Sequence, residues 1–330
     1  MEILKHGFIV FLPLVFIGCT ETFDPGISSE PVLCLNSLIT AGEPVSVKVS
    51  RTWTYNDVNG QENHSVDDAV VLVYANGELC DAEYIPREGD EIRILAQSRK
   101  YGSAEATVKV PEAVPVYAVD FVPEVLSKST WENPRLVMTG RMSFNMRVAL
   151  RIDDSKDTDN YFRLDVSGRL TPDEPDGYVA SHYPYSYYTP GEFDYNTEPI
   201  FKEHVGVFES VMGDDSDAFM VFSDRQFAGK SYTLNLVFNK AGFYIASPVY
   251  DESLYNAEIV FTLTSVSRSY YDRALYVWQR DNGIIGDLGD FGFAEPLAAY
   301  SNVSTGAGVV AARSFSTYTL SLKDFLKSQF

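Results

Sequence analysis

Short runs of apolar residues separated by turn residues dominate the first third of the chain. Between residues 31 and 112 there are five such runs: Pro31–Thr40, Val45–Trp53, Ala69–Ala75, Glu91–Gln97 and Ala104–Val110. In the second run Val45, Val47 and Val49 alternate with polar residues, as in a strand with one buried face. Asn76-Gly77 follows the third run and is a strong hairpin signal, because a type I′ turn needs positive φ at both central residues. Residues 31–112 are therefore predicted to form a β-sandwich of immunoglobulin-like size.

The remaining residues, 116–330, continue the β pattern after the linker Pro111–Pro115. A proline at each end of this linker interrupts strand pairing, so the linker is predicted to separate two domains. Apolar and polar residues alternate again in five further runs: Arg147–Ile152, Tyr161–Val166, Phe219–Phe222, Tyr232–Phe238 and Glu258–Leu263. The second domain is therefore predicted to be larger and mainly antiparallel β.

One segment of the second domain, near residues 268–282, has the period of a helix. Tyr271, Ala274, Leu275 and Trp278 recur at i, i+3, i+4 and i+7, which places them on one helical face. We expect this helix to cover the end of a sheet or barrel, with its aromatic stripe in the core. The predicted fold is thus mainly β, with an N-terminal immunoglobulin-like β-sandwich, a larger β domain and one helix in the C-terminal half.

The start of the chain has the pattern of a secretory leader. The apolar run Phe8–Ile17 follows Lys5 and is too short to span a membrane, which takes about 20 residues. Gly18 is the small residue that a signal peptidase needs, and Cys19 supplies a thiol that accepts diacylglycerol. Residues 1–18 are therefore predicted to be a lipoprotein signal peptide, with Cys19 carrying palmitate-type acyl chains. The alternative is an ordinary cleaved leader followed by an incidental cysteine.

Residues 19–30 are expected to form a flexible tether. They are polar, contain Pro25 and Gly26, and show no periodicity. The lipobox usually has Leu or Val three residues before its cysteine, whereas Phe16 stands at that position here. The expected location is the outer membrane, with the protein lipid-anchored on either the periplasmic face or the cell surface.

The net charge of −20 limits the classes of partner. No basic stripe is present to neutralise phosphates, so nucleic acid is not expected as a partner. The same charge disfavours electrostatic adhesion to anionic lipids, so membrane contact is expected through the lipid on Cys19. Cys34 and Cys80 remain as a pair that an oxidising compartment would allow to bridge, although two free, partly buried thiols are favoured.

Catalytic and metal-binding patterns are weak. His64, His182 and His204 are scattered and no Gly-x-Ser-x-Gly occurs, so no catalytic residue, enzyme activity or cofactor is predicted. Asp153–Asn160 has the clustered oxygens that calcium prefers. It lacks the Gly and the distant Glu of an EF-hand loop, so a solvated hairpin turn is favoured over a metal site. Gly306 and Gly308 do not lie between a strand and a helix, which indicates a bulge or close backbone approach rather than a phosphate loop.

A tyrosine-rich segment, residues 178–195, is the most suggestive candidate for binding. Pro184, Pro190 and Gly191 predict a loop, which we call the tyrosine segment. Exposed aromatic rings supply rigid contact area for sugars, peptides or proteins. The alternative is that the rings cover the second domain. The candidate contact residues are Tyr178, Tyr183, Tyr185, Tyr187, Tyr188 and Tyr195.

Several short motifs together resemble one family. Near the C-terminus these are Phe293-Ala-Glu-Pro296, Tyr300-Ser-Asn302 and Gly306-Ala-Gly308. Earlier matches are Asp153 running to Asn160-Tyr161-Phe162, Asp224 with Gly229-Lys230 and Tyr232, Asp68-Ala69-Val70, and Val110-Pro111. Combined with the helix that contains Tyr271, this pattern is similar to the lipoproteins grouped as domain of unknown function 4249.

That resemblance implies an extracytoplasmic lipoprotein of Bacteroidetes-type bacteria with no assigned activity, of a kind often encoded beside TonB-dependent outer-membrane transporters. The function expected is therefore that of a non-enzymatic accessory or partner subunit of an outer-membrane transport system. The alternative is a surface lipoprotein that captures glycan or peptide through the tyrosine segment.

Overall fold

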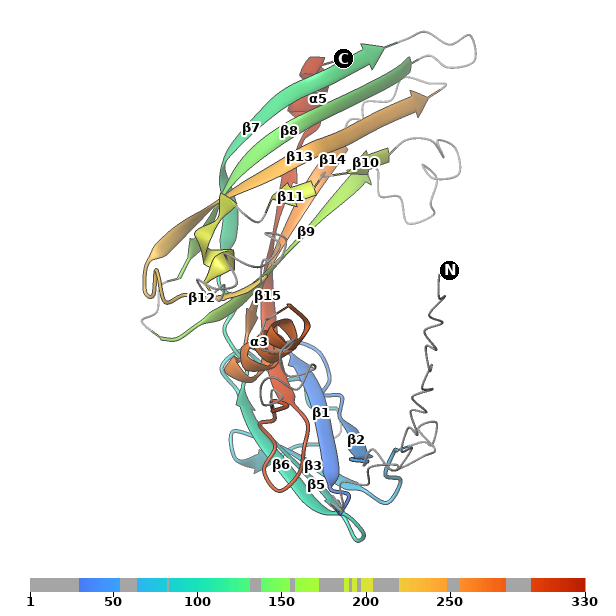
Figure 1. The fold of residues 1–330 in the computed structure, drawn as a ribbon, viewed down its shortest axis with the longest axis vertical. Coiled ribbons are helices and arrows are strands. Elements are labelled where there is room, and N and C mark those ends of the chain that lie inside the picture. The colour runs from blue at the N-terminus through green and yellow to red at the C-terminus, as the bar shows by residue number, and fades with distance from the viewer. Residues whose placement is uncertain are drawn as a thin grey trace, which may run out of the picture.

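The computed structural model describes residues 30–329, except 54–63, 82, 131–137, 155–157, 172–186, 190–191, 195–196, 204–219, 248–255 and 283–297. The fold is mainly β, as predicted, and is elongated, with one β unit above another (Figure 1). We call the lower unit the N-terminal sandwich and the upper unit the large sandwich.

The N-terminal sandwich contains the first six strands. A four-stranded antiparallel sheet, β4-β3-β5-β6, packs against β1, and Val49 of β2 packs against the same core. The strand bounds are β1 Leu33–Thr40, β2 Lys48–Arg51, β3 Val70–Ala75, β4 Glu78–Leu79, β5 Glu91–Ser98 and β6 Gly102–Lys109. Asn76 and Gly77 have φ of 51° and 88°, which confirms the predicted type I′ hairpin between β3 and β4. The core of the N-terminal sandwich includes Leu33, Leu35 and Ile94, each 0% exposed.

The large sandwich packs a five-stranded sheet against part of a six-stranded one. Their strand orders are β10-β13-β8-β7, with β11 also on β13, and β12-β9-β14-β15-β1-β2. Phenylalanines such as Phe144, Phe162 and Phe261 fill the space between the sheets. The bounds are β7 Val116–Thr130, β8 Met138–Asp153, β9 Tyr161–Thr171, β10 Tyr187–Thr189, β11 Glu192–Asp194, β12 Val221–Ser223, β13 Ser231–Ser247, β14 Asn256–Val266 and β15 Val310–Ser321.

Strand β15 belongs to both sandwiches. Its first residues, Val310–Arg313, pair in parallel with Ser37–Thr40 of β1, and Arg313–Ser321 pair antiparallel with β14. Val303, Val310 and Ala312 also lie in the core of the N-terminal sandwich. The predicted division at residues 112–116 coincides with the connection between β6 and β7, but the C-terminal segment from Val303 to Ala312 packs with the N-terminal sandwich.

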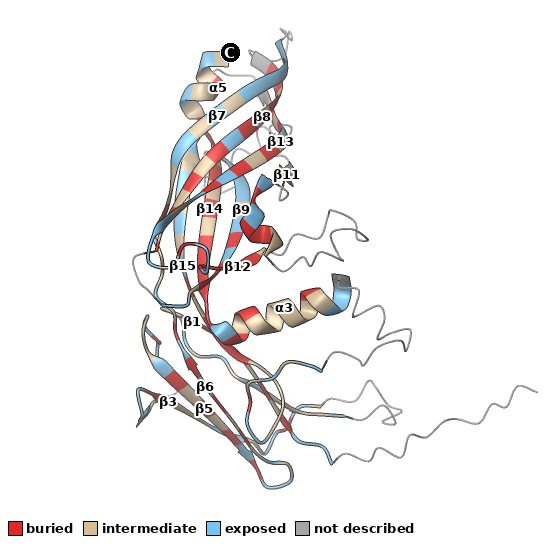
Figure 2. Ribbon diagram, turned by 60° about the vertical axis from the view of Figure 1, so that its left-hand side comes forward, coloured by how far each residue is buried: buried red, intermediate tan, exposed pale blue. Residues whose placement is uncertain are grey.

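Helix α3 (Arg268–Asn282) projects from the junction of the two sandwiches (Figure 2). Tyr271 and Trp278 are 3% and 9% exposed, and they pack with Tyr161, Val221 and Val266 of the six-stranded sheet. The aromatic stripe is therefore core, as expected. The other helices within the described residues are the 3₁₀ helix η2 (Pro199–Lys202) and α5 (Lys323–Gln329), whose Phe325 contacts Phe121 and Phe144.

Two local expectations have different outcomes. Cys34 and Cys80 are free thiols of intermediate burial, as favoured. The tyrosine segment is not a loop throughout, because residues 187–189 and 192–194 form β10 and β11 on β13. Proline and glycine do not prevent short edge strands, which need few ladder hydrogen bonds.

The glycines near the C-terminus allow a close backbone approach, as predicted. A Cβ on Gly308, whose φ is +112°, would lie 2.2 Å from the carbonyl oxygen of Leu35, and one on Gly306 would lie 2.6 Å from that of Leu33. These contacts flank the hydrogen bonds from Leu35 N to Ala307 O and from Ala307 N to Leu33 O, at 2.8 and 2.9 Å. Both glycines therefore let the segment before β15 pair with β1.

Gly308→Ala is expected to lower the free energy of unfolding by about 2–4 kcal/mol, because it combines an unfavourable φ with a backbone clash. Gly42→Ala is the matched control, since Gly42 has φ of +83° with nothing within 4 Å of its added Cβ. That control should cost only about 1–2 kcal/mol. Urea unfolding measures both, and an equal loss for the two variants would contradict the close approach.

Candidate functional site

Four strand termini meet at one end of the large sandwich and bring two networks of polar side chains together. Strands β8 and β12 end there, and β9 and β13 begin there. Asp153 and Asp154 follow one another at the end of β8, but their side chains have different environments. The first belongs to a partly exposed network and the second to a buried one.

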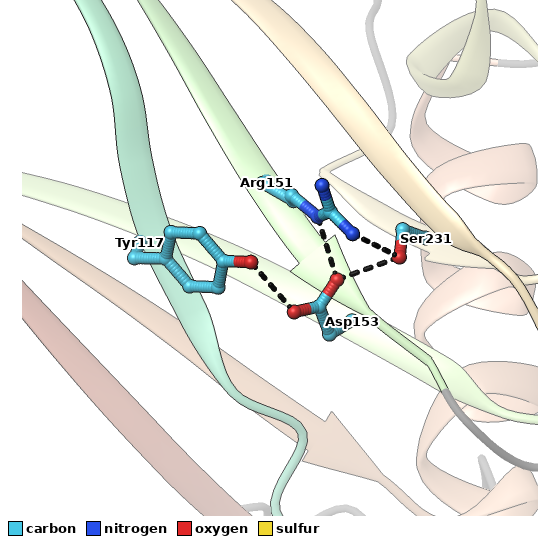
Figure 3. Close-up of polar contacts among 4 residues, drawn as sticks. All are labelled: Tyr117, Arg151, Asp153 and Ser231. Carbon is cyan, nitrogen blue, oxygen red and sulfur yellow. Dashed lines mark hydrogen bonds and ion pairs between the residues drawn. The ribbon is translucent and has the colours of Figure 1, made fainter.

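The partly exposed network is centred on Asp153 (Figure 3). Its Oδ1 accepts hydrogen bonds from Arg151 Nε and Ser231 Oγ, each at 2.7 Å, and its Oδ2 accepts one from Tyr117 Oη at 2.7 Å. Arg151 also donates to Ser231 Oγ at 2.8 Å. The donors from Ser231, Arg151 and Tyr117 lower the pKa of Asp153 to about 2. The network therefore ties β7, β8 and β13 together through an ionised carboxylate.

The buried network joins Asp154 and Asp224, which are 3% and 1% exposed. Asn160 donates its backbone N–H to Asp224 Oδ2 at 2.9 Å and its amide to Asp154 Oδ1 at 3.2 Å. Gly229 N donates to Asp154 Oδ2 at 3.2 Å. Burial, with a further contribution from the charge of Asp154, raises the pKa of Asp224 to about 6.

These networks hold one carboxyl group whose pKa is lowered, Asp153, and one whose pKa is raised, Asp224, a separation that also occurs in acid–base sites. Here the oxygens of Asp153 accept hydrogen bonds from three side-chain donors. Of the oxygens of Asp154, one accepts a bond from Asn160 in its own turn and the other from Gly229 in the turn before β13. In the described part of the chain no three His, Cys, Asp or Glu side chains gather as metal ligands. The contacts favour the turn interpretation of Asp153–Asn160 over the calcium one.

The buried network brings together two of the motifs singled out in the sequence. Asn160 and Tyr161 come from one motif, and Asp224 and Gly229 come from the other, yet they meet across β9 and β12. The Tyr232 ring of the second motif stacks on Phe227 at 4.9 Å. The motifs therefore share a structural task, which is to join the turn before β9 to the turn before β13.

Most of the predicted contact residues lie outside the described residues. Cys19, Tyr178, Tyr183, Tyr185 and Tyr195 are among them. Tyr187 and Tyr188 lie in β10, where their backbones pair with Tyr244 and Phe243 of β13. The structure therefore places these last two candidates at one edge of the five-stranded sheet.

The opposite edge of that sheet, strand β7, carries a feature that the sequence prediction missed. Four apolar side chains on it are 39–52% exposed: Val119, Val122, Val125 and Leu126. Within the described chain β7 pairs only with β8, so its outer side is an edge. The run from Val116 to Leu126 alternates weakly and contains Pro123, which hid the strand from pattern analysis.

Two shallow surface depressions lie in the N-terminal sandwich. One of about 630 Å³ includes Asn76, Tyr84 and Asp90, and one of about 510 Å³ includes Gly42 and Pro86. Tyr84 Oη donates to Asp90 Oδ2 at 2.6 Å, which raises the pKa of Tyr84 to about 12. The polar side chains that line the larger depression therefore hydrogen-bond to one another, which indicates that they stabilise the local loop structure.

No helix within the described ranges has the length and apolar character needed to cross a bilayer. A family model described as "Domain of unknown function (DUF4249)" matches residues 20–319. No curated protein matches the chain, and no solved structure does.

Asp224→Asn is expected to stabilise the protein above about pH 6. The folded pKa of Asp224, about 6, exceeds its ordinary value of 3.8, so the folded state binds more protons between these values and stability falls as pH rises through about 6. Asparagine mimics the protonated acid, so the gain should be about 1–3 kcal/mol at pH 8 and vanish near pH 4. Urea unfolding across this range measures it; an unchanged pH dependence would contradict the shifted pKa.

Asp153→Asn is expected to destabilise the protein at neutral pH, opposite to the effect of Asp224→Asn. The folded pKa of Asp153 is lowered to about 2, so its stabilisation is present above the ordinary value of 3.8 and is lost as pH falls through about 2. The variant should therefore be less stable than the wild type at neutral pH, and the difference should shrink in acid. Thermal unfolding of both proteins from neutral pH downward tests this, and a difference that is constant with pH would refute it.

Proposed function

Because the chain belongs to the family described as domain of unknown function 4249, we propose that it is a non-enzymatic lipoprotein of the cell envelope. In this proposal Cys19 carries the lipid anchor in the outer membrane, and the folded part binds an outer-membrane transport protein of the TonB-dependent type. The leader pattern and the family resemblance support the location and the class of partner.

The main observation that supports protein binding is the exposed edge of β7. Val119 and Leu126 are 52% and 50% exposed, and Val122 and Val125 are 42% and 39% exposed, all on one strand. Val122 registers with the exposed Arg147 and Val125 with the buried Phe144, so these side chains lie on both faces of the edge strand. Apolar side chains gathered along an exposed strand edge are typical of protein interfaces. A protein surface is the partner that fits an extended strand edge better than a small ligand, which needs a concave pocket.

Several features of β7 limit backbone pairing of its exposed edge with strands of other chains. Its register shifts between Ala118 and Asp120 and again between Val125 and Ser127, and Pro123 lacks an N–H to donate. Asp120 Oδ1 accepts the N–H of Phe121 at 2.9 Å, which occupies one further donor. An edge interrupted in this way favours side-chain docking by one partner over open-ended strand addition.

Glycan or peptide capture through the tyrosine segment is the second candidate. The observation that favours it is the position of Tyr187 and Tyr188 on β10, at the sheet edge opposite β7. Tyrosine is a residue type suited to stacking on sugar rings or on peptide side chains.

The deciding experiment is a pull-down from detergent-solubilised envelope, with the lipidated protein as bait and quantitative mass spectrometry as readout. We expect stoichiometric recovery of one outer-membrane β-barrel transporter. Val122→Asp should lower that recovery about tenfold, because a buried charge at an interface centre costs more than 1 kcal/mol.

Leu79→Asp is the matched control, because Leu79 is 61% exposed on β4 of the other sandwich. Its recovery should equal that of the wild type. Recovery of no protein above background would refute the transporter proposal. Binding on a glycan array that is lost in Tyr187→Ala and Tyr188→Ala would then establish the second candidate.

A further inference from the structure

Trp53 is the most exposed large aromatic residue among those described, at 59%. Its indole stacks on the imidazole of His64, with ring centroids 4.4 Å apart and planes inclined by 9°. The backbone carbonyl of His64 accepts the N–H of Arg51 at 2.9 Å, which ties the His64 main chain to the end of β2. Trp53 is thus an exposed ring held in a defined orientation, at little further entropic cost on binding.

This ring lies where the predicted tether enters the fold. Thr52 N donates to Val32 O at 2.9 Å, and Val32 N donates to Thr52 Oγ1 at 3.0 Å. Continuing the antiparallel register from Leu33 and Arg51 places Trp53 opposite Pro31. Val32 is itself 36% exposed. An apolar surface therefore adjoins the point at which the chain arrives from Cys19.

The turn between β5 and β6 extends this end of the N-terminal sandwich. Asp68, close in sequence to His64, accepts a bond from Ser98 Oγ at 3.1 Å, and Ser98 Oγ accepts the N–H groups of Lys100 and Tyr101. The turn presents Arg99 and Lys100 as exposed cations. We call the surface made by Val32, Trp53, His64 and the turn 99–101 the tip.

Charge at the tip differs from that of the whole chain. Among the described residues of the tip and their near neighbours in sequence, the basic Arg51, Arg99 and Lys100 balance the acidic Glu30, Asp67 and Asp68, whereas the chain as a whole carries −20. An anionic bilayer would repel most of this acidic protein but not its tip. Figure 1 shows β1 and β2 at the end of the molecule opposite α5, so the tip is also a molecular end.

We propose that the tip rests on the bilayer that holds the Cys19 anchor, with the Trp53 indole among the lipid headgroups. The inference depends on the lipid anchor of the proposed function. Ten residues, 20–29, separate Cys19 from Glu30, and a flexible chain of that length spans about 16–19 Å on average. The tether therefore keeps the tip near the bilayer. Trp is the residue best suited to this boundary, because its ring is apolar and its N–H can still bond to water or headgroups.

The test uses the full-length lipidated protein in vesicles of phosphatidylethanolamine and phosphatidylglycerol with brominated acyl chains, which quench nearby tryptophans. Trp131→Phe removes one of the other indoles and leaves Trp53 with Trp278, which is 9% exposed. We expect brominated lipid to reduce the emission intensity of this variant relative to ordinary lipid. The double variant Trp53→Phe/Trp131→Phe should show no such reduction.

Equal quenching of the two variants would overturn the inference. Unquenched Trp53 emission from protein that is fully bound to brominated vesicles would also overturn it. Flotation of the same samples reports the anchor separately. A wild-type chain that neither floats with vesicles nor carries a diacylglyceryl mass on Cys19 would refute the lipoprotein proposal itself, a result distinct from bound protein with unquenched Trp53.

Discussion

The pairing of β15 with both β1 and β14 is the constraint on which the rest of the structure depends. Arg313 takes part in both ladders, since it is registered with Thr40 on one side and with Val266 on the other. Its Nε donates to Thr40 Oγ1 at 3.1 Å, and its carbonyl accepts the N–H of Ala41 at 3.0 Å. Without this shared strand the two sandwiches would lose the sheet that runs from one to the other and would keep chain connections such as the one between β6 and β7. With it, one sheet runs continuously through both.

A shared sheet gives the molecule a defined long axis, which matters for the functions proposed above. The tip and the exposed edge of β7 belong to different sandwiches, so they face different surroundings when one end lies on a bilayer. A flexible two-domain chain would have to order itself when a partner binds, at a cost in conformational entropy. In a continuous sheet the relative orientation of the two sandwiches is already fixed on folding, so this entropy is not lost again on binding. The same continuity fixes where α3 emerges, because Tyr271 and Val266 pack together where β14 and β15 separate.

Local features of this fold could be predicted from sequence, and long-range ones could not. The hairpin at Asn76-Gly77 and the helix near residues 268–282 follow from turn chemistry and period, which act within a few residues. The pairing of Ser37 with Val310 joins residues far apart in sequence, and the local pattern of neither strand predicts which strand it pairs with. Likewise, Asp224 and Asn160 were each part of a recognised motif, but only the fold brings them into contact. Strand β7 was hidden by Pro123, which an edge position tolerates.

The junction between the sandwiches is polar, and this explains how its geometry is set. Ser267 Oγ accepts the N–H of Ala312 at 3.0 Å, Ser269 Oγ donates to the carbonyl of Val310 at 2.8 Å, and the Asn302 side chain bonds both polar groups of Val310. Hydrophobic contact is non-directional, whereas hydrogen bonds weaken steeply when misaligned. Two apolar cores in direct contact could slide against one another. A layer of buried serines and a paired asparagine between them instead holds β15 at one angle, and this angle orients the tip relative to the β7 edge.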